Sequence, residues 1–209
     1  MRGIVFTGGE GPGPEVLKII ARKADVLAAA DSGLMAAEQA GLKVDWITGD
    51  MDSLDDPGRL EKYSPEQIRR FPADKDLTDT ELALALLQEN GCDDIWIAGG
   101  GGGRMDHLFA IRSLFDRDNP PGRWYTADQE IRCVMEGTLF KKSLSAESLV
   151  SVFPLGSGPW EADSFGLKWP LVGLPWKNGS FGLSNVASYG HFEIRSIRGR
   201  FMVIMPLGA

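Results

Sequence analysis

The chain has 209 residues, 43% of them hydrophobic, with 22 basic against 29 acidic residues and a formal net charge of −7. The apolar content excludes a disordered chain, and the acidic balance argues against a nucleic-acid partner, whose binding surface would be basic. Two cysteines are too few for a disulfide framework, no apolar run has the length of a membrane span, and the first residues do not form a signal peptide. We therefore expect a cytoplasmic protein with no nucleic-acid partner and no membrane partner.

The start of the chain has the pattern of a strand, a turn and a helix. An apolar run at 4–6 is followed by four glycines between positions 8 and 13, and Pro14 suits the first position of a helix. This is the opening of a nucleotide-type α/β unit. The dinucleotide fingerprint is incomplete, because Val16 stands in place of its third glycine. Phosphate contact and a plain flexible turn are both compatible with this loop.

Further short apolar runs predict the remaining strands of this half. They span 25–30, 44–47, 68–71, 95–98 and 124–126. The first of them ends at Asp31, in the position where open α/β sheets bind their ligands. A helix N-cap is the rival role for Asp31 or Ser32.

A pair of aspartates follows the strand predicted at 44–47. Asp50 and Asp52 are two residues apart, so in an extended segment both carboxylates point to the same face. Such a pair repels, and a divalent cation relieves the repulsion; Mg²⁺ prefers one or two carboxylates together with phosphate oxygens. The alternative is a loop in which Asp50 caps a turn and Asp52 is solvated.

A second acidic cluster lies ahead of a predicted helix. Thr78 and Glu81 have capping-box spacing, so these two residues and Asp79 are explained by helix capping alone. Asp74 and Asp76 are not needed for the cap and again stand two apart. Two such pairs in one α/β domain predict a metal–phosphate site.

A glycine-rich turn follows the strand predicted at 95–98. Gly99–Gly103 would allow backbone N–H groups to approach an anion, and the next helix adds partial positive charge at its N-terminus. Arg104 supplies a forked donor suited to phosphate. The alternative is a glycine hinge with Asp106 as an acid at the helix start; His107 is not assigned a catalytic role.

The second half of the chain is β-rich. Its predicted strands span 131–135, 149–153, 165–169, 183–187, 192–197 and 201–205, separated by glycine, proline, serine and asparagine. Such punctuation predicts an all-β sandwich or barrel. The fold expected is a Rossmann-like α/β domain with a mostly parallel sheet over 1–130, followed by an all-β sandwich domain over 131–209.

Together, these motifs resemble those of thiamine pyrophosphokinase. The first-half motifs, in the family's order, are 30–33 (ADSG), 49–53 (GDMDS), 74–79 (DKDLTD) and 103–107 (GRMDH). The second half is similar to the family's thiamine-binding β domain at 150–155 (VSVFPL), 166–169 (GLKW) and 182–185 (GLSN). Ser32 stands where many relatives have glycine, and the five-glycine run is richer in glycine than the family pattern.

The resemblance implies an ATP-dependent diphosphotransferase. Such an enzyme moves the β,γ-pyrophosphoryl group of ATP to the hydroxyl of thiamine, giving thiamine diphosphate and AMP with Mg²⁺ as cofactor. It also implies that 1–130 bind ATP and Mg²⁺, that 131–209 bind thiamine, and that the protein is a homodimer with its sites at the subunit interface. A pyrophosphokinase for another flat acceptor, such as a hydroxymethyl pterin, and a non-catalytic sensor of nucleotide or thiamine are the alternatives.

The site residues implied fall into four groups. The metal ligands are Asp50, Asp52, Asp74 and Asp76. The catalytic carboxylates are Asp50, Asp52, Asp76 and Asp79. The ATP-binding residues are Asp31, Lys75, Thr78, Arg104, Asp106 and His107. The thiamine-binding residues are Trp169, Ser184 and Asn185.

Overall fold

The computed structural model describes residues 1–54, 56–72 and 74–208 and divides them into two compact units. The first contains Met1–Ile111 and Trp124–Ala127, and the second contains the remaining described residues. Within the described part of the chain, no helix is long and apolar enough to cross a membrane.

The first unit is an α/β structure. Its elements begin with β1 (Arg2–Phe6), α1 (Pro14–Ala21), β2 (Val26–Ala30), α2 (Gly33–Gln39) and β3 (Trp46–Gly49). Two 3-10 helices, η1 (Pro57–Lys62) and η2 (Pro65–Gln67), precede β4 (Ile68–Arg70). The elements that follow are α3 (Asp79–Glu89), β5 (Asp94–Ala98), α4 (Met105–Leu114), which continues into the second unit, and β6 (Arg123–Tyr125). Each strand predicted in this half corresponds to an observed one.

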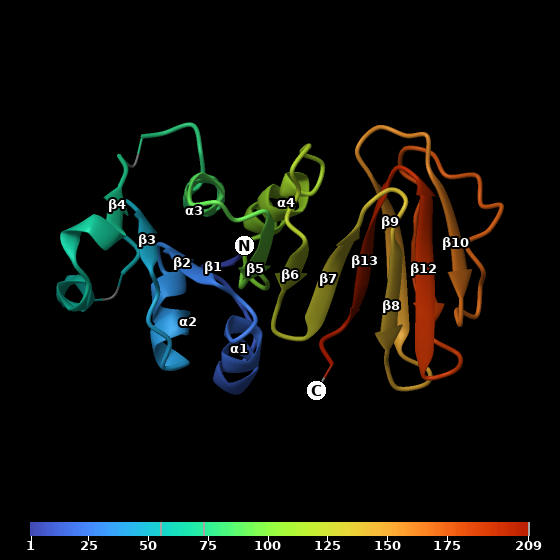
Figure 1. Cartoon of the computed structure of the whole chain (residues 1–209), viewed down its shortest axis with the longest axis horizontal. Coiled ribbons are helices and arrows are strands. Elements are labelled where there is room, and N and C mark those ends of the chain that lie inside the picture. The colour runs from blue at the N-terminus through green and yellow to red at the C-terminus, as the bar shows by residue number, and fades with distance from the viewer. Residues whose placement is uncertain (55, 73, 209) are drawn as a thin grey trace. The chain divides into compact units, whose positions relative to one another are not determined.

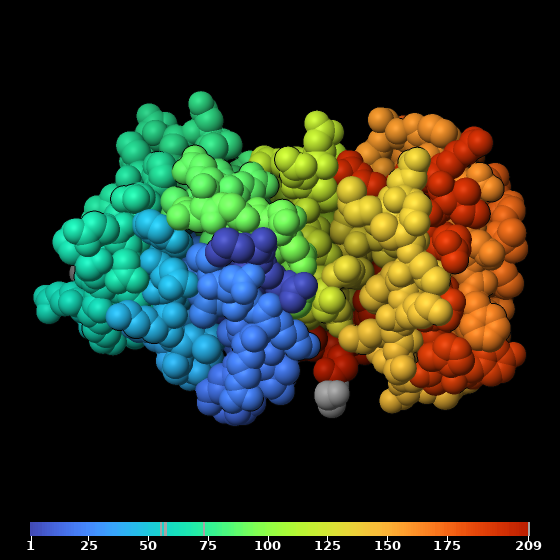
Figure 2. All heavy atoms as spheres, in the orientation of Figure 1, coloured from blue at the N-terminus to red at the C-terminus, as the bar shows by residue number. Residues whose placement is uncertain are grey.

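The sheet of this unit has the strand order β6-β5-β1-β2-β3-β4. The β5–β1, β1–β2, β2–β3 and β3–β4 pairs are all parallel, which confirms the mostly parallel sheet. Helices α1 and α2 lie on one face of the sheet and α3 on the other (Figure 1). The segment with η1 and η2, coloured teal, lies on the surface of this unit (Figure 2). Because the strands are parallel, their carboxyl ends share one edge.

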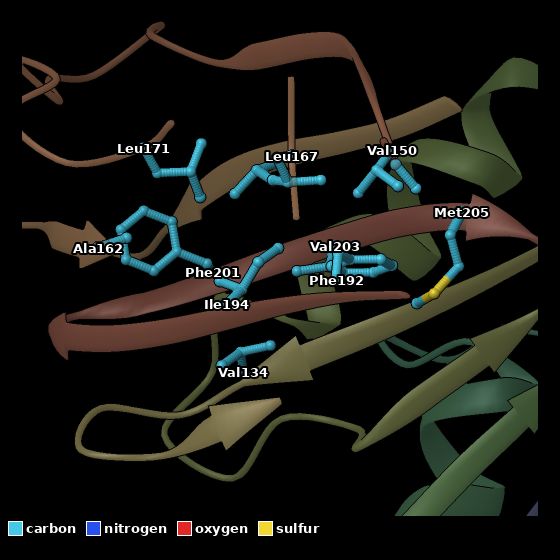
Figure 3. Close-up of a cluster of buried hydrophobic side chains, with 12 residues drawn as sticks. Val134, Val150, Ala162, Leu167, Leu171, Phe192, Ile194, Phe201, Val203 and Met205 are labelled. Carbon is cyan, nitrogen blue, oxygen red and sulfur yellow. The ribbon is translucent and has the colours of Figure 1, made fainter. Parts of the chain in front are cut away.

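The second unit contains two antiparallel sheets. Its strands are β7 (Gln129–Val134), β8 (Leu139–Ser143), β9 (Leu149–Leu155), β10 (Glu161–Phe165), β11 (Gly182–Val186), β12 (His191–Arg198) and β13 (Arg200–Pro206). One sheet has the order β11-β9-β13-β7 and the other β10-β12-β8. Buried side chains from both sheets, among them Val203 of β13 and Ile194 of β12, form one apolar core (Figure 3).

Two details of the predicted β pattern are wrong. The strand predicted at 165–169 is absent beyond Phe165, because Gly166 has a φ of +77° and turns the chain. A Cβ at Gly166 would lie 2.3 Å from the carbonyl oxygen of His191, so only glycine fits this close approach. The strands β8 and β10 carry lysine, aspartate and serine and lack the apolar alternation that would have revealed them.

We expect that Phe192→Ala will destabilise the second unit by about 3–5 kcal/mol, the usual cost of truncating a buried aromatic side chain. Phe192 is fully buried in the shared core and meets Phe140 edge to face. Tyr189→Ala is the matched control, because Tyr189 is 72% exposed and its loss should change stability by at most about 0.5 kcal/mol. Urea denaturation followed by near-ultraviolet circular dichroism measures both. Equal stability of the two variants would contradict the core assignment.

Candidate functional site

The carboxyl edge of the parallel sheet is joined to the first turn of α3. The hydroxyls of Thr7, just after β1, and Thr80 are both buried and lie 2.7 Å apart. The Thr48 hydroxyl, in β3, donates to the carbonyl oxygen of Asp79 at 3.3 Å. These two contacts hold the N-terminus of α3 over the ends of β1 and β3.

Three carboxylates converge at this edge. Asp31 follows β2, Asp50 follows β3 and Asp79 is the first residue of α3. One carboxylate oxygen of each lies within 4.8 Å of the others, and all three side chains are partly buried. Among the described residues this is the group of acidic side chains arranged to hold a metal ion.

Gly49 allows this approach. Its φ is +141°, and a Cβ at this position would lie 3.3 Å from both the Cβ of Asp31 and Oδ1 of Asp79. A side chain there would meet both neighbours and would also be strained by the backbone conformation. The glycine at the end of β3 therefore leaves room for carboxylates from two other elements.

Asp31 is held in an unusual conformation at the end of β2. Its φ is +48°, and its N–H donates to the carbonyl oxygen of Thr48 at 2.8 Å. Burial raises the pKa of its carboxyl, and the charges of Asp79 and Asp50 add to the rise. Oδ1 of Asp31 is buried without a hydrogen-bond partner. Helix α2 begins without a side-chain cap, so the N-cap role considered for this residue is not realised.

Lys75 lies between two of the carboxylates. Its Nζ is 3.1 Å from Oδ1 of Asp79 and 3.9 Å from Oδ2 of Asp50. The lysine side chain is only 15% exposed. The site therefore contains one ammonium group against three acidic groups.

The segment from Asp50 to Ser53 is a turn, so the prediction that Asp50 and Asp52 share one face of an extended segment is wrong. Met51 has a φ of +68°, and Oδ1 of Asp50 accepts the N–H of Asp52 at 3.1 Å. This hydrogen bond holds the pKa of Asp50 below its ordinary value. The turn-capping alternative describes this loop, yet Asp50 also belongs to the three-carboxylate group. Asp52 is exposed, and its Oδ1 accepts the hydroxyl of Ser53 at 3.0 Å.

Some residues of the second acidic cluster cap helix α3, and others are exposed to solvent. Thr78 and Glu81 form the predicted capping box, with Thr78 N–H donating to Glu81 at 2.8 Å and Glu81 N–H donating back at 3.2 Å. Asp74 and Asp76 are exposed. Their metal roles stay predictions, whereas Asp79, which capping alone could explain, lies in the carboxylate group.

The glycine run after β5 is used mainly by the protein itself. The N–H groups of Gly99, Gly100 and Gly101 donate to carbonyl oxygens of Tyr125, Gly8 and Glu10 at 2.8–2.9 Å. The two glycine-rich turns of this unit are thus hydrogen-bonded to each other. The predicted phosphate contact can therefore involve only the N–H groups of Gly102 and Gly103.

Arg104, Asp106 and His107 are exposed at the start of α4. Arg104 forms a two-pronged pair with Asp106, with Nε and Nη2 at 3.2 and 2.5 Å from the two carboxylate oxygens. This guanidinium holds the pKa of Asp106 at about 2. A phosphate would therefore compete with Asp106 for the same fork.

The predicted thiamine residues lie together in the second unit. Asn185 is buried; its Oδ1 accepts the N–H of Trp169 at 3.1 Å, and its Nδ2 donates to the Trp169 carbonyl at 2.6 Å. Trp169 is 53% exposed, and Nζ of Lys168 lies 4.8 Å from the centroid of its ring. Ser184, exposed with a φ of +55°, precedes Asn185. The Asn185 amide thus holds the backbone that carries the exposed ring.

The carboxylate group fits Mg²⁺. Mg²⁺ takes oxygen ligands, and the group offers carboxylate oxygens from three elements; two of these oxygens, Oδ1 of Asp31 and Oδ1 of Asp79, are buried without a hydrogen bond. Sequence reasoning assigned Asp31 and Asp79 to ATP binding and catalysis and missed them as partners of Asp50. The signal that could have joined them is their common position at strand ends and at a helix start.

Comparisons with known proteins find one family that is similar to the first part of the chain. Residues 17–119 match the model of the thiamin pyrophosphokinase catalytic domain. Over 80 residues the chain is 38% identical to the thiamine pyrophosphokinase of Bacillus subtilis (strain 168), and this stretch is 37% of each protein. The sequence match therefore spans about a third of that relative's length.

The fold is that of solved thiamin pyrophosphokinase structures. The Bacillus subtilis structure aligns with a TM-score of 0.78 at 22% identity over 100% of both chains. The structure from Geobacillus thermodenitrificans aligns with a TM-score of 0.76 at 24% identity over 100% of this chain and 99% of that one. The structure from Candida albicans aligns with a TM-score of 0.75 at 16% identity over 99% of this chain and 88% of that one.

We expect Asp31→Asn to raise the free energy of unfolding at neutral pH in the presence of a chelator. The folded protein raises the pKa of Asp31, so it binds this proton more tightly than the unfolded chain does. The protonated carboxyl of Asp31 therefore stabilises the folded protein fully at pH values below the ordinary aspartate pKa, and this stabilisation is lost as the pH rises through the folded-state pKa. The gain from Asn should shrink to nothing at acidic pH. Asparagine also tolerates the positive φ.

The matched control is Asp118→Asn, at an exposed carboxylate, which should change stability by at most about 0.5 kcal/mol. Chemical denaturation of the three proteins from pH 3 to pH 8 measures the difference. If Asp31→Asn lowered stability at pH 8, the Asp31 carboxylate would be favourably placed as an anion, which would contradict its raised pKa.

Proposed function

We propose that the chain belongs to the thiamin pyrophosphokinase family, whose catalytic-domain model matches residues 17–119, and that it transfers the pyrophosphoryl group of ATP to the hydroxyl of thiamine, giving thiamine diphosphate and AMP. The observation that carries the proposal is the Asp31–Asp50–Asp79 group at the carboxyl edge of the sheet, inside the matched region. Carboxylates at this edge suit a metal–nucleotide complex, because phosphoryl transfer is catalysed mainly by positioning and charge neutralisation.

The residues proposed to hold Mg²⁺ are the three of this group, with Asp52, Asp74 and Asp76 retained as predicted ligands. Bound there, the ion would neutralise phosphate charge and align the triphosphate. The turn from Asp50 to Asp52 presents the Asp52 carboxylate to solvent, beside the Ser53 hydroxyl. An exposed carboxylate at the rim can accept the proton of an acceptor hydroxyl, and Asp50, Asp52, Asp76 and Asp79 are the proposed catalytic set.

The proposed ATP-binding residues act through charge and hydrogen bonding. Lys75 and Arg104 contribute positive charge toward the phosphates, and the capped start of α3 adds the partial positive charge of a helix N-terminus. Asp31, Thr78, Asp106 and His107 complete the predicted set. Arg104 would exchange its present partner Asp106 for a phosphate oxygen, since both are bound by the same fork.

The thiamine side of the proposal rests on the second unit. The exposed Trp169 ring offers a flat face to the cationic thiazolium, and the Ser184 hydroxyl can hydrogen-bond to the substrate. Asn185 supports Trp169 by binding both its N–H and its carbonyl oxygen. We propose a cytoplasmic homodimer in which the β domain of one copy closes the site of the other, as the family resemblance implies.

The direct test is product analysis by mass spectrometry after mixing the protein with ATP, Mg²⁺ and thiamine. We expect thiamine diphosphate and AMP in equal amounts. Asp50→Asn should lower kcat by at least about a hundredfold, the scale for losing a group that stabilises transition-state charge. Thiamine monophosphate with ADP would contradict pyrophosphoryl transfer. A product with a pterin but not with thiamine would show that the acceptor is a pterin.

Trp169→Ala should raise the KM for thiamine roughly tenfold while leaving the KM for ATP unchanged. A cation–π contact of about 1–2 kcal/mol corresponds to that factor. Tyr189→Ala removes another exposed aromatic ring of the same unit and serves as the control. Steady-state kinetics with each substrate varied in turn gives both constants. An unchanged KM for thiamine in the Trp169 variant would show that Trp169 does not stack on thiamine.

A further inference from the structure

The two acidic groups that contact Lys75 differ in how their oxygens are used. Oδ1 of Asp50 accepts a backbone N–H within its own turn, which leaves Oδ2 facing the ammonium at 3.9 Å. Oδ1 of Asp79 faces the same ammonium at 3.1 Å and accepts no aligned hydrogen bond. The lysine is therefore held between the two carboxylates by charge.

The surroundings make this contact stronger than a surface ion pair. The side chains of Lys75, Asp50 and Asp79 are 15%, 18% and 25% exposed, respectively. Charges in such partly buried positions are screened less than charges in open water. Asp31 adds a third carboxyl group with a buried, unpartnered oxygen. One ammonium cannot neutralise three carboxylates, so a net negative charge remains at the site.

We propose that the Lys75 ammonium is the resident counter-cation of the Asp50–Asp79 pair in the ligand-free protein, and that it yields this position to the divalent cation when nucleotide binds. The inference deepens the proposed function, because the nucleotide phosphates provide the ammonium with its second partner. A divalent ion carries twice the charge of the ammonium and can take oxygens from all three carboxylates. In the ligand-free protein, the cation must displace Lys75 from two of them.

This competition links the two ligands. A triphosphate that attracts the ammonium frees Asp50 and Asp79 for the cation, and a cation that displaces the ammonium makes it available to the triphosphate. By thermodynamic linkage each ligand then raises the affinity of the other by the same factor. Lys75 thereby favours entry of the metal as a complex with nucleotide over binding of the metal alone.

The test is Mn²⁺ titration of the ligand-free protein, followed by calorimetry and by the electron paramagnetic resonance of unbound Mn²⁺. We expect Lys75→Gln to bind Mn²⁺ about tenfold or more tightly than the wild type, because the competing charge is gone. Lys75→Arg keeps the charge and should stay near the wild type. Lys62→Gln removes a lysine that is paired with Glu38, 3.3 Å away, and controls for the change in net charge.

A second readout keeps the outcome clear if Lys75→Gln is less stable. In a chelator its melting temperature should fall below that of the wild type, because the carboxylates repel without the ammonium. Saturating Mn²⁺ should raise the melting temperature of Lys75→Gln by more than that of the wild type, since tighter binding to the folded state gives a larger shift. Lys75→Met provides an independent uncharged variant.

Mn²⁺ affinity in Lys75→Gln that equals or falls below the wild-type value would overturn the proposal, as would an equal gain in Lys62→Gln. Neither titration contains ATP or thiamine. A failure of the proposed reaction would therefore appear in the product analysis and leave these measurements unchanged, so the two conclusions can fail separately.

Discussion

The site depends on holding three carboxyl groups from separate parts of the chain within 4.8 Å of one another. Two unit charges about 4 Å apart repel by about 1 kcal/mol in water and about 4 kcal/mol at the effective dielectric of a protein surface. A repulsion of this size is a large share of the 5–15 kcal/mol by which domains are usually stable. The fold offsets it by burial that favours the protonated form of Asp31, by a backbone N–H bound to Asp50 and by the ammonium of Lys75.

The scaffold that imposes this proximity is ordinary parallel-sheet geometry. Parallel strands end at one edge, so residues that follow β2 and β3 become neighbours, and the threonine contacts bring the first turn of α3 to the same edge. A Cβ at Gly49 would crowd both Asp31 and Asp79, so the glycine leaves room for their approach. The carboxylate group is thus a consequence of strand order, of the threonine contacts that hold α3 and of a missing side chain.

Hydrogen-bond partners decide which motif residues remain available to a ligand. The N–H groups of Gly99, Gly100 and Gly101 donate to carbonyl oxygens of the protein, and the amide of Asn185 binds the backbone of Trp169. These residues shape the site and position other groups. The exposed groups, such as the Trp169 ring and the Asp52 carboxylate, are the ones left to meet a substrate.

The sequence by itself determined the strands and the parallel α/β character of the first half, the capping box at Thr78 and the acidic motifs, because these depend on local periodicity and on short spacings. It could not determine that residues 50–53 form a turn or that β10 ends at Phe165, because the positive φ values of Met51 and Gly166 leave no distinctive pattern. The grouping of Asp31 and Asp79 with Asp50, and the place of Lys75 between two of them, were decided only by the tertiary structure. Strand order, which no local pattern encodes, sets the distances between carboxylates that lie far apart in the chain.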